Sequence, residues 1–283
     1  MSGTGGNTVI ATHSGWDDFD LKLMKVLGTC LGLIFIVSTY LHFWAPQVLQ
    51  VPQTPVPDNT ALDMLYMEIL TLVMAGLCGM HCYRKFGPYA TMLFFVGSFV
   101  FTGTMENIMI ITGRFDLIPF KSYYFNKGGF ILYFDVPLSV CLGWFVFAYS
   151  SVYISGVIFP KAGPVALAAI ASFICMDIDL WSDPVMTHPA NMYWTWLQDR
   201  GATTHVFSIP LYNFIGWFGI IFFFEVLWLY TQDWHLTMGK KKATIRFFIW
   251  LFALMVAYLL LVVGMELLIR ATLPHVNYTI GGI

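Results

Sequence analysis

The sequence predicts an all-α polytopic membrane protein, a bundle of about seven transmembrane helices with its N-terminus in the cytoplasm. Hydrophobic residues make up 58% of the 283-residue chain and charged residues only 11%, whereas soluble domains average about 25% charged residues. The apolar residues gather in stretches long enough to cross the ~30 Å hydrocarbon core of a bilayer as helices of about 20 residues. The net charge of -2 leaves no basic surface, so we expect no nucleic-acid partner.

The apolar stretches define the order of the predicted helices. They fall at residues 23–44, 62–81, 89–112, 130–153, 164–181, 206–230 and 244–269. Because a backbone inside lipid must satisfy its own hydrogen bonds, and because the stretches lack the alternation of barrel strands, we expect helices. We predict a polar tail at 1–22, one transmembrane domain at 23–270 and an outer tail at 271–283. The proline-rich connection at 46–57 is predicted to be an extended outer loop.

Basic residues in the connections orient the predicted helices. One side holds more of them, namely Lys22, Lys25, Arg84, Lys85, Lys161, Lys240, Lys241, Lys242 and Arg246. The other side holds Arg114, Lys121, Lys127, Arg200 and Arg270. The positive-inside rule therefore places the N-terminus in the cytoplasm and the C-terminus outside, which requires an odd number of spans. The five cysteines all lie in apolar runs, which favours reduced, buried thiols over a disulfide framework.

Carboxyl groups within the apolar stretches are the first candidates for function, because a charge inside a membrane is costly. Glu106 lies several residues inside the third stretch, and Asp177, Asp179 and Asp183 lie at the outer end of the fifth. Asp177 and Asp179 should point to different sides of their helix. We therefore expect Asp179 to face the bundle interior and approach Glu106. Asp183 precedes Pro184, so it is also a candidate helix N-cap.

Other polar residues have simpler interpretations. Glu225 and Glu266 are expected to pair with arginine or with polar groups between helices. The segment Cys78-Gly79-Met80-His81-Cys82 lacks a second half with metal-ligand spacing, so we expect no metal site. No G-x-S-x-G, P-loop or G-x-G-x-x-G motif occurs, which argues against nucleophilic and nucleotide chemistry.

Aromatic residues concentrate after Pro184. They are Tyr193, Trp194, Trp196, Phe207, Tyr212 and Trp217. They are typical of an interfacial aromatic belt, or alternatively of a slot whose rings contact an apolar or polyene ligand. Asn213 and Trp217 are four residues apart and share a helix face. The amide of Asn213 would bond a neighbouring helix or position a water molecule.

The motifs from about Glu106 to Tyr230 follow a distinctive order. It runs ENIMIITGRF, an SYY turn, DVPLSVCLGWFVFAY, DLWSDPVM with a Trp-rich tail, and IPLYNFIGWF. This order resembles the membrane-embedded carotenoid biosynthesis family that includes the CruF-type acyclic carotenoid 1,2-hydratases, such as bisanhydrobacterioruberin hydratase. The similar core covers residues 106–230, and the first two predicted spans and the last show no resemblance. RFDLIPFKSYYF departs from the family's compact F-G-x-Y-x-Y segment, whose glycine is missing.

The resemblance implies hydration of the terminal C1=C2 double bond of an acyclic carotenoid, without cofactor or metal. An acid protonates C2, and water adds to the tertiary cation at C1. By position, Asp179 or Glu106 would be the acid, Asp183 the ion-stabilising partner and Asn213 the residue that orients water. The expected substrate contacts are Tyr124, Trp144, Trp181, Tyr193, Trp196 and Trp217. A carotenoid or other polyisoprenoid and membrane lipid are the expected partners, in a bacterial or archaeal cytoplasmic membrane.

Two alternatives stay open. The missing glycine and the unmatched flanking helices favour a non-catalytic carotenoid- or lipid-binding subunit of a larger membrane complex, with other membrane subunits as partners. A Mg²⁺-dependent isoprenoid transferase of the UbiA type would need paired acidic sites and basic residues for the diphosphate. Only Asp179 and Asp183 have that spacing, and Arg200 is the one base nearby.

Overall fold

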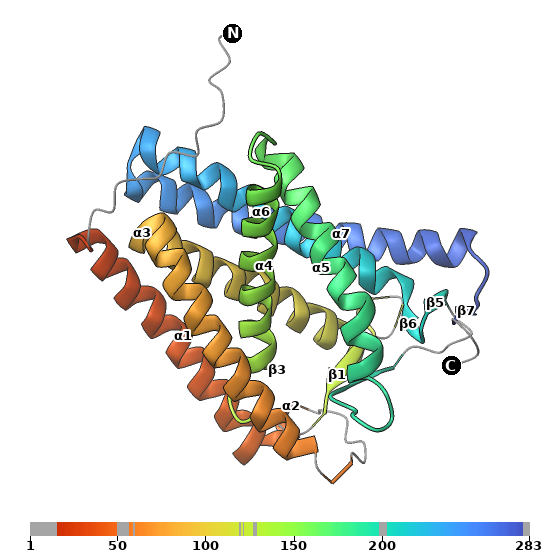
Figure 1. The fold of residues 1–283 in the computed structure, drawn as a ribbon. Helices are drawn as coiled ribbons and strands as arrows, with labels where there is room; N and C mark the ends of the chain where they lie inside the picture. The colour runs from red at the N-terminus through yellow and green to blue at the C-terminus, as the bar shows by residue number, and fades with distance from the viewer. Residues whose placement is uncertain are drawn as a thin grey trace.

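The computed structural model is a bundle of long helices with short strand pairs at one end (Figure 1). It describes residues 16–49, 57–58, 60–118, 120, 122–126, 129–197 and 203–279. The long helices are α1 (Asp18–Trp44), α3 (Thr60–Arg114), α4 (Leu138–Ile158), α5 (Pro164–Met186), α6 (Leu211–Met238) and α7 (Lys240–Thr272). These 6 helices are all long and apolar enough to cross a membrane. The predicted all-α polytopic bundle is confirmed, and the chain is an integral membrane protein.

Helix α3 contains both the second and the third predicted span. It is 55 residues long, and its backbone leaves the helical region at Gly87, with φ 81° and ψ 175°. Glycine adopts a positive φ at little cost, and the following Pro88 has no N–H to donate to a helical hydrogen bond. Figure 1 shows the chain changing direction between the orange first half of α3 and its olive second half. The seven predicted stretches are therefore present, with two of them as halves of one kinked helix.

One end of the bundle is held together by contacts between α1, the Gly87 bend and the start of α7. Lys240 donates hydrogen bonds to the carboxylates of Asp17 and Asp20, each 2.7 Å long. The hydrogen bond from Lys240 lowers the pKa of Asp17 below its usual range. Tyr89, just after the bend, donates to the carbonyl of Lys240 over 3.1 Å. The ends of these three segments that were predicted to lie on the cytoplasmic side are thus at the same end of the bundle. Which side of the membrane this end faces stays a prediction.

Short strands occupy the opposite end, and all of their pairings are antiparallel except that of β5 with β7. β1 (Tyr123–Phe125) pairs with β4 (Trp194–Trp196), which joins the α3–α4 connection to the α5–α6 connection. β2 (Leu132–Tyr133) pairs with β3 (Val136–Pro137). β5 (His205–Val206) lies between β6 (Ile209–Pro210) and β7 (Asn277–Tyr278), antiparallel to β6 and parallel to β7.

These strands correct two predicted boundaries. The fourth and sixth spans were expected to begin at 130 and 206, but α4 begins at Leu138 and α6 at Leu211. A hairpin precedes each helix and ends in a proline, Pro137 or Pro210, which takes the N-cap position. Within the predicted extended loop at 46–57, Pro46–Leu49 form the short helix α2, whereas residues 50–56 lie outside the described residues. The domain boundaries themselves stay a prediction.

A buried ion pair stabilises the strand-bearing end. Arg114, the last residue of α3, lies 2.7 Å from the carboxylate of Asp135, and their side chains are 9% and 6% exposed. His42 of α1 lies 3.0 Å from the other oxygen of Asp135. Arg114 also donates to the carbonyl of Leu49 over 2.7 Å. The cluster therefore fastens α1, α2 and α3 to the β2–β3 turn.

We expect Arg114→Gln to destabilise the protein by about 3 kcal/mol, because breaking a buried pair leaves the carboxylate of Asp135 without its cation. The measurement is the midpoint temperature at which the purified protein loses its monodisperse size-exclusion peak. Lys161→Gln, which removes an exposed cation in the α4–α5 turn, is the matched control and should leave the midpoint unchanged. Equal midpoints for the two variants would contradict this assignment.

Candidate active site

Helix α5 supplies two acidic residues to the bundle interior. Asp179 is 0% exposed and Asp183 is 2% exposed, whereas Asp177 is exposed on another side of the helix. The predicted separation of Asp177 from Asp179 is thus confirmed. The predicted N-cap role of Asp183 is wrong, because α5 continues to Met186 with Pro184 inside it. Asp183 is free to contact side chains of other elements.

Asn213, near the start of α6, joins the two acids. Its side-chain Nδ2 donates to Asp179 over 2.8 Å and to Asp183 over 2.7 Å. One amide nitrogen carries two hydrogens, so it can serve both carboxyl groups at once. The second oxygen of Asp183 accepts a 2.6 Å hydrogen bond from the indole of Trp194. Both oxygens of Asp183 therefore have donors, whereas Oδ1 of Asp179 has no partner among the described residues.

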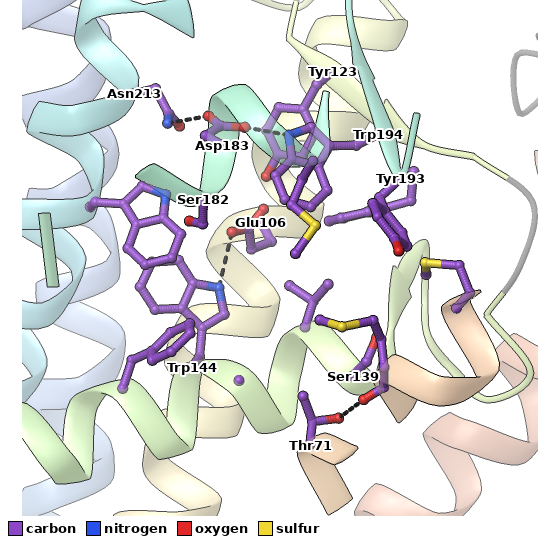
Figure 2. A pocket seen from close by; sticks show the side chains of 18 of the residues that line it. Thr71, Glu106, Tyr123, Ser139, Trp144, Ser182, Asp183, Tyr193, Trp194 and Asn213 are labelled. Atoms are coloured by element: carbon purple, nitrogen blue, oxygen red, sulfur yellow. Dashed lines mark hydrogen bonds between the residues drawn. The ribbon is translucent and has the colours of Figure 1, made fainter. Parts of the chain in front are cut away.

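Glu106, from the second half of α3, faces the same region. Its Oε1 accepts a 3.0 Å hydrogen bond from the indole of Trp144 on α4, and its Oε2 has no partner in the described part of the chain. Figure 2 shows Glu106 and Asp183 on the wall of one pocket. Asp179 lies close enough to interact electrostatically with both of them. The predicted interior orientation of Asp179 toward Glu106 is supported.

The pocket is a cavity of about 140 Å³ between α3, α4, α5, α6 and the β1–β4 pair. Its polar groups include Glu106, Asp183 and Asn213, and most of its wall is aromatic or thioether side chains. A second pocket of about 30 Å³ shares Glu106 and Asn213 with it. A water molecule needs roughly 10–15 Å³ measured in this way. The smaller pocket can therefore hold a water molecule beside the same two polar residues.

Aromatic residues form the walls. The rings of Trp144 and Trp217 lie 4.1 Å apart between centroids, and those of Tyr123 and Trp196 lie 4.7 Å apart across the β1–β4 pair. Of the predicted substrate contacts, the cavity wall includes Trp144, Tyr193, Trp196 and Trp217. The aromatic slot is therefore formed by residues of α4, α6 and the α5–α6 connection.

Two predicted contacts lie elsewhere. Trp181 is 76% exposed, and two residues along a helix from Asp183 correspond to about 200° of rotation, so it faces the outside. Tyr124 is buried but does not line the cavity, because neighbouring strand residues point to opposite faces and Tyr123 takes the cavity side. We correct both expectations.

Several lining residues were missed by the sequence analysis. Trp194 belongs to the aromatic segment that the sequence analysis singled out, but it was not among the expected substrate contacts, although strand alternation puts it on the same face as Trp196. Met64, Met67 and Thr71, on the first half of α3, close the wall opposite α5. Nothing in the local sequence predicts these three, because they reach the site through the packing of the kinked helix.

The remaining candidates behave as structural groups. Glu266 accepts hydrogen bonds from Arg270 over 2.6 Å and Thr203 over 3.0 Å, as predicted. Glu225 is 0% exposed and, within the described residues, neither of its oxygens has a hydrogen-bond partner, so neither the predicted pairing with arginine nor the alternative, a bond to polar groups between helices, is found there. His81 lies 2.6 Å from the hydroxyl of Tyr149. The described ranges hold no group of three His, Cys, Asp or Glu residues that could bind a metal.

The fold and the pocket define an α-helical membrane protein with an acidic, aromatic-walled cavity near one end of its bundle. The family model for carotenoid biosynthesis proteins matches residues 64–281. The chain therefore belongs to this family and has a role in carotenoid biosynthesis. The match extends over the second and last predicted spans, for which the sequence analysis found no resemblance. No curated protein and no solved structure matches the chain.

Proposed function

We propose that this protein hydrates the terminal C1=C2 double bond of an acyclic carotenoid in a bacterial or archaeal cytoplasmic membrane. The observation that carries the proposal is the meeting of Glu106 and Asp183 in one aromatic-walled cavity beside a water-sized pocket. A carboxylic acid transfers its proton to C2, and the π electrons leave a tertiary cation at C1. Water then adds to C1 and loses a proton, so the net change is the addition of one water molecule.

Glu106 is the best placed acid. Trp144 is only a donor, so the Oε1 atom that it contacts acts as an acceptor. Oε2 has no partner among the described residues and is the oxygen that can carry the proton toward the substrate. Apolar surroundings favour the neutral form of a carboxyl group, and the acid must be neutral before it reacts. The cavity wall around Glu106 is mainly aromatic, which meets this requirement.

Asp183 is the matching carboxylate. Apolar burial acts on Asp183 as it does on Glu106, but donors from Asn213 and Trp194 hold both oxygens of Asp183, whereas Glu106 has a donor on one oxygen only. Because hydrogen bonds to a carboxylate favour its ionised form, Asp183 is the better suited of the two to be the anion. An anion fixed on the cavity wall stabilises the developing cation at C1. The faces of Trp144 and Trp217 add cation–π stabilisation. Asp179 does not line the cavity, so we assign it a positioning role, through its hydrogen bond with Asn213.

The nucleophilic water is assigned to the smaller pocket. Asn213 uses its Nδ2 for the two aspartates, which leaves its side-chain oxygen to accept a hydrogen bond from water. As water adds to C1, its proton passes to Asp183 or returns to the carboxylate of Glu106. Return to Glu106 restores the starting protonation directly, and a proton taken by Asp183 must pass on to Glu106 before the next turnover, so no further reactant is needed.

The size of the cavity indicates how a long substrate binds. A volume of about 140 Å³ is below the ~300–1,000 Å³ of typical ligand sites. It holds the end of an isoprenoid chain, and the rest of the polyene must extend along the bundle into lipid. The cavity wall includes no Lys or Arg among the described residues, so it lacks the cations that a diphosphate substrate requires. Arg200, considered above for that role, lies outside the described residues.

Production of the protein in a host that makes lycopene or a bacterioruberin precursor tests the proposal. We expect a more polar carotenoid, heavier by one water, with an unchanged visible spectrum because the terminal double bond is outside the conjugated chain. Membranes incubated in ¹⁸O-labelled water should place the label in this product. Asp177→Asn, which alters an exposed acid on the same helix, is the control and should be fully active.

The same production experiment can also contradict the proposal. If the protein accumulates in the membrane and no hydrated carotenoid forms, the hydratase proposal is wrong. Copurification with unmodified pigment and with other subunits in fixed ratio would then support the non-catalytic binding role.

A further inference from the structure

A second hollow lies at the opposite end of the bundle from the strands, between α1 and the two halves of α3. Its volume is about 660 Å³, within the ~300–1,000 Å³ range of ligand sites. Leu27, Gly28 and Leu31 of α1 form one wall, and Gly79, Met92 and Phe95 of α3 form the rest with their apolar neighbours. Figure 1 shows α1 and the first half of α3 running alongside each other at this end.

Glycines help to keep this groove open. A Cβ atom added at Gly28 or at Gly79 would meet no atom within 4 Å. The space arises because α3 turns at Gly87, so its second half diverges from its first half and from α1. The groove therefore offers a mainly apolar space, with volume for part of a hydrocarbon chain, on the outer side of the bundle.

One cation lies on the wall of the groove. Arg84, three residues before the bend, is exposed and lines it. Among the described residues it makes no hydrogen bond or ion pair. Trp16 and Tyr83 stack at the same end, with ring centroids 6.3 Å apart, as aromatic residues do at the level of lipid headgroups. Lys85 is the next residue, but it does not line the groove.

We propose that this groove binds an anionic phospholipid, with an acyl chain against α1 and α3 and the phosphate on Arg84. The guanidinium group matches a phosphate with two parallel hydrogen bonds. The positive-inside pattern places Arg84 at the cytoplasmic leaflet, which carries the anionic lipids. A carotenoid lacks an anion for Arg84, and a second copy of the chain would place another basic end against it. The inference does not depend on the proposed hydration.

Native mass spectrometry tests the site with the full-length protein. The protein is reconstituted in bilayers of equal phosphatidylglycerol and phosphatidylcholine, extracted in mild detergent and analysed for retained lipid. We expect retention of phosphatidylglycerol over phosphatidylcholine. Arg84→Gln should lower that preference about fivefold, the factor that corresponds to one basic residue at an anionic membrane surface.

Two further variants distinguish binding in this groove from the general electrostatic attraction of anionic lipids to basic residues. Lys85→Gln removes the same charge one residue away and should leave the preference unchanged. Gly28→Leu combined with Gly79→Leu fills the groove and should abolish retention of either lipid. The proposal would be overturned if the Arg84 and Lys85 variants lost the phosphatidylglycerol preference equally. It would also be overturned if the variant with the filled groove retained as much lipid as the wild type. A wild-type dimer that dissociates in the filled variant would identify a second copy as the occupant and overturn it too.

Discussion

Glu106→Gln should reduce the rate of carotenoid hydration by about 10²–10⁴-fold, the usual contribution of a general acid. Glutamine keeps the volume of the side chain and an oxygen that can accept the hydrogen bond from Trp144, so the wall of the cavity should be preserved. It cannot deliver a proton from Oε2, the unpartnered oxygen. The measurement is the initial rate of ¹⁸O incorporation into carotenoid by membranes with equal amounts of each variant.

Trp144→Phe is the matched change beside Glu106. It removes the 3.0 Å hydrogen bond to Oε1 and leaves the carboxyl group in place. We expect a loss smaller than that of Glu106→Gln, because the proton donor is retained and only its orientation suffers. A fully active Glu106→Gln variant would exclude Glu106 as the acid.

The helices were predictable from hydropathy because every span must be apolar over the thickness of the membrane. The kink at Gly87 was not predicted, since Gly87-Pro88 also marks an ordinary turn between two spans. The hairpins before α4 and α6 were not predicted, because the predicted spans included most of their residues. The second strand of each hairpin, Val136–Pro137 or Ile209–Pro210, is short and apolar, and periodicity cannot distinguish such runs from helix.

The polar centre of the site was predictable for an energetic reason. Carboxyl groups inside a membrane are costly, so Glu106, Asp179 and Asp183 stand out in apolar sequence, and Asn213 joins two of them in the structure. The walls were harder to predict, because a tryptophan faces a cavity or lipid according to its position around the helix. Trp181 lies on the outer side of α5 and Trp217 on the inner side of α6.

Asp183→Asn should cause the second large loss of activity, larger than the loss caused by Asp179→Asn. If Asp183 were a helix cap, asparagine would replace it with little effect, since the two residues cap almost equally well. Asp183 instead lines the cavity and accepts from Trp194 over 2.6 Å and from Asn213 over 2.7 Å. Asparagine removes the negative charge that stabilises the cation and places an N–H group against one of these donors.

We therefore expect Asp183→Asn to lower the hydration rate by about 10²–10³-fold, as loss of one electrostatic contact in an active site does. Asp179→Asn should lower it less, because Asp179 does not line the cavity and contacts it only through Asn213. The measurement is the rate of ¹⁸O incorporation by each variant at saturating substrate, so that differences in substrate binding do not contribute to the comparison. A larger loss in Asp179→Asn than in Asp183→Asn would show that Asp179 does more than position Asn213, and the assignment of Asp183 as the ion-stabilising carboxylate would have to be abandoned.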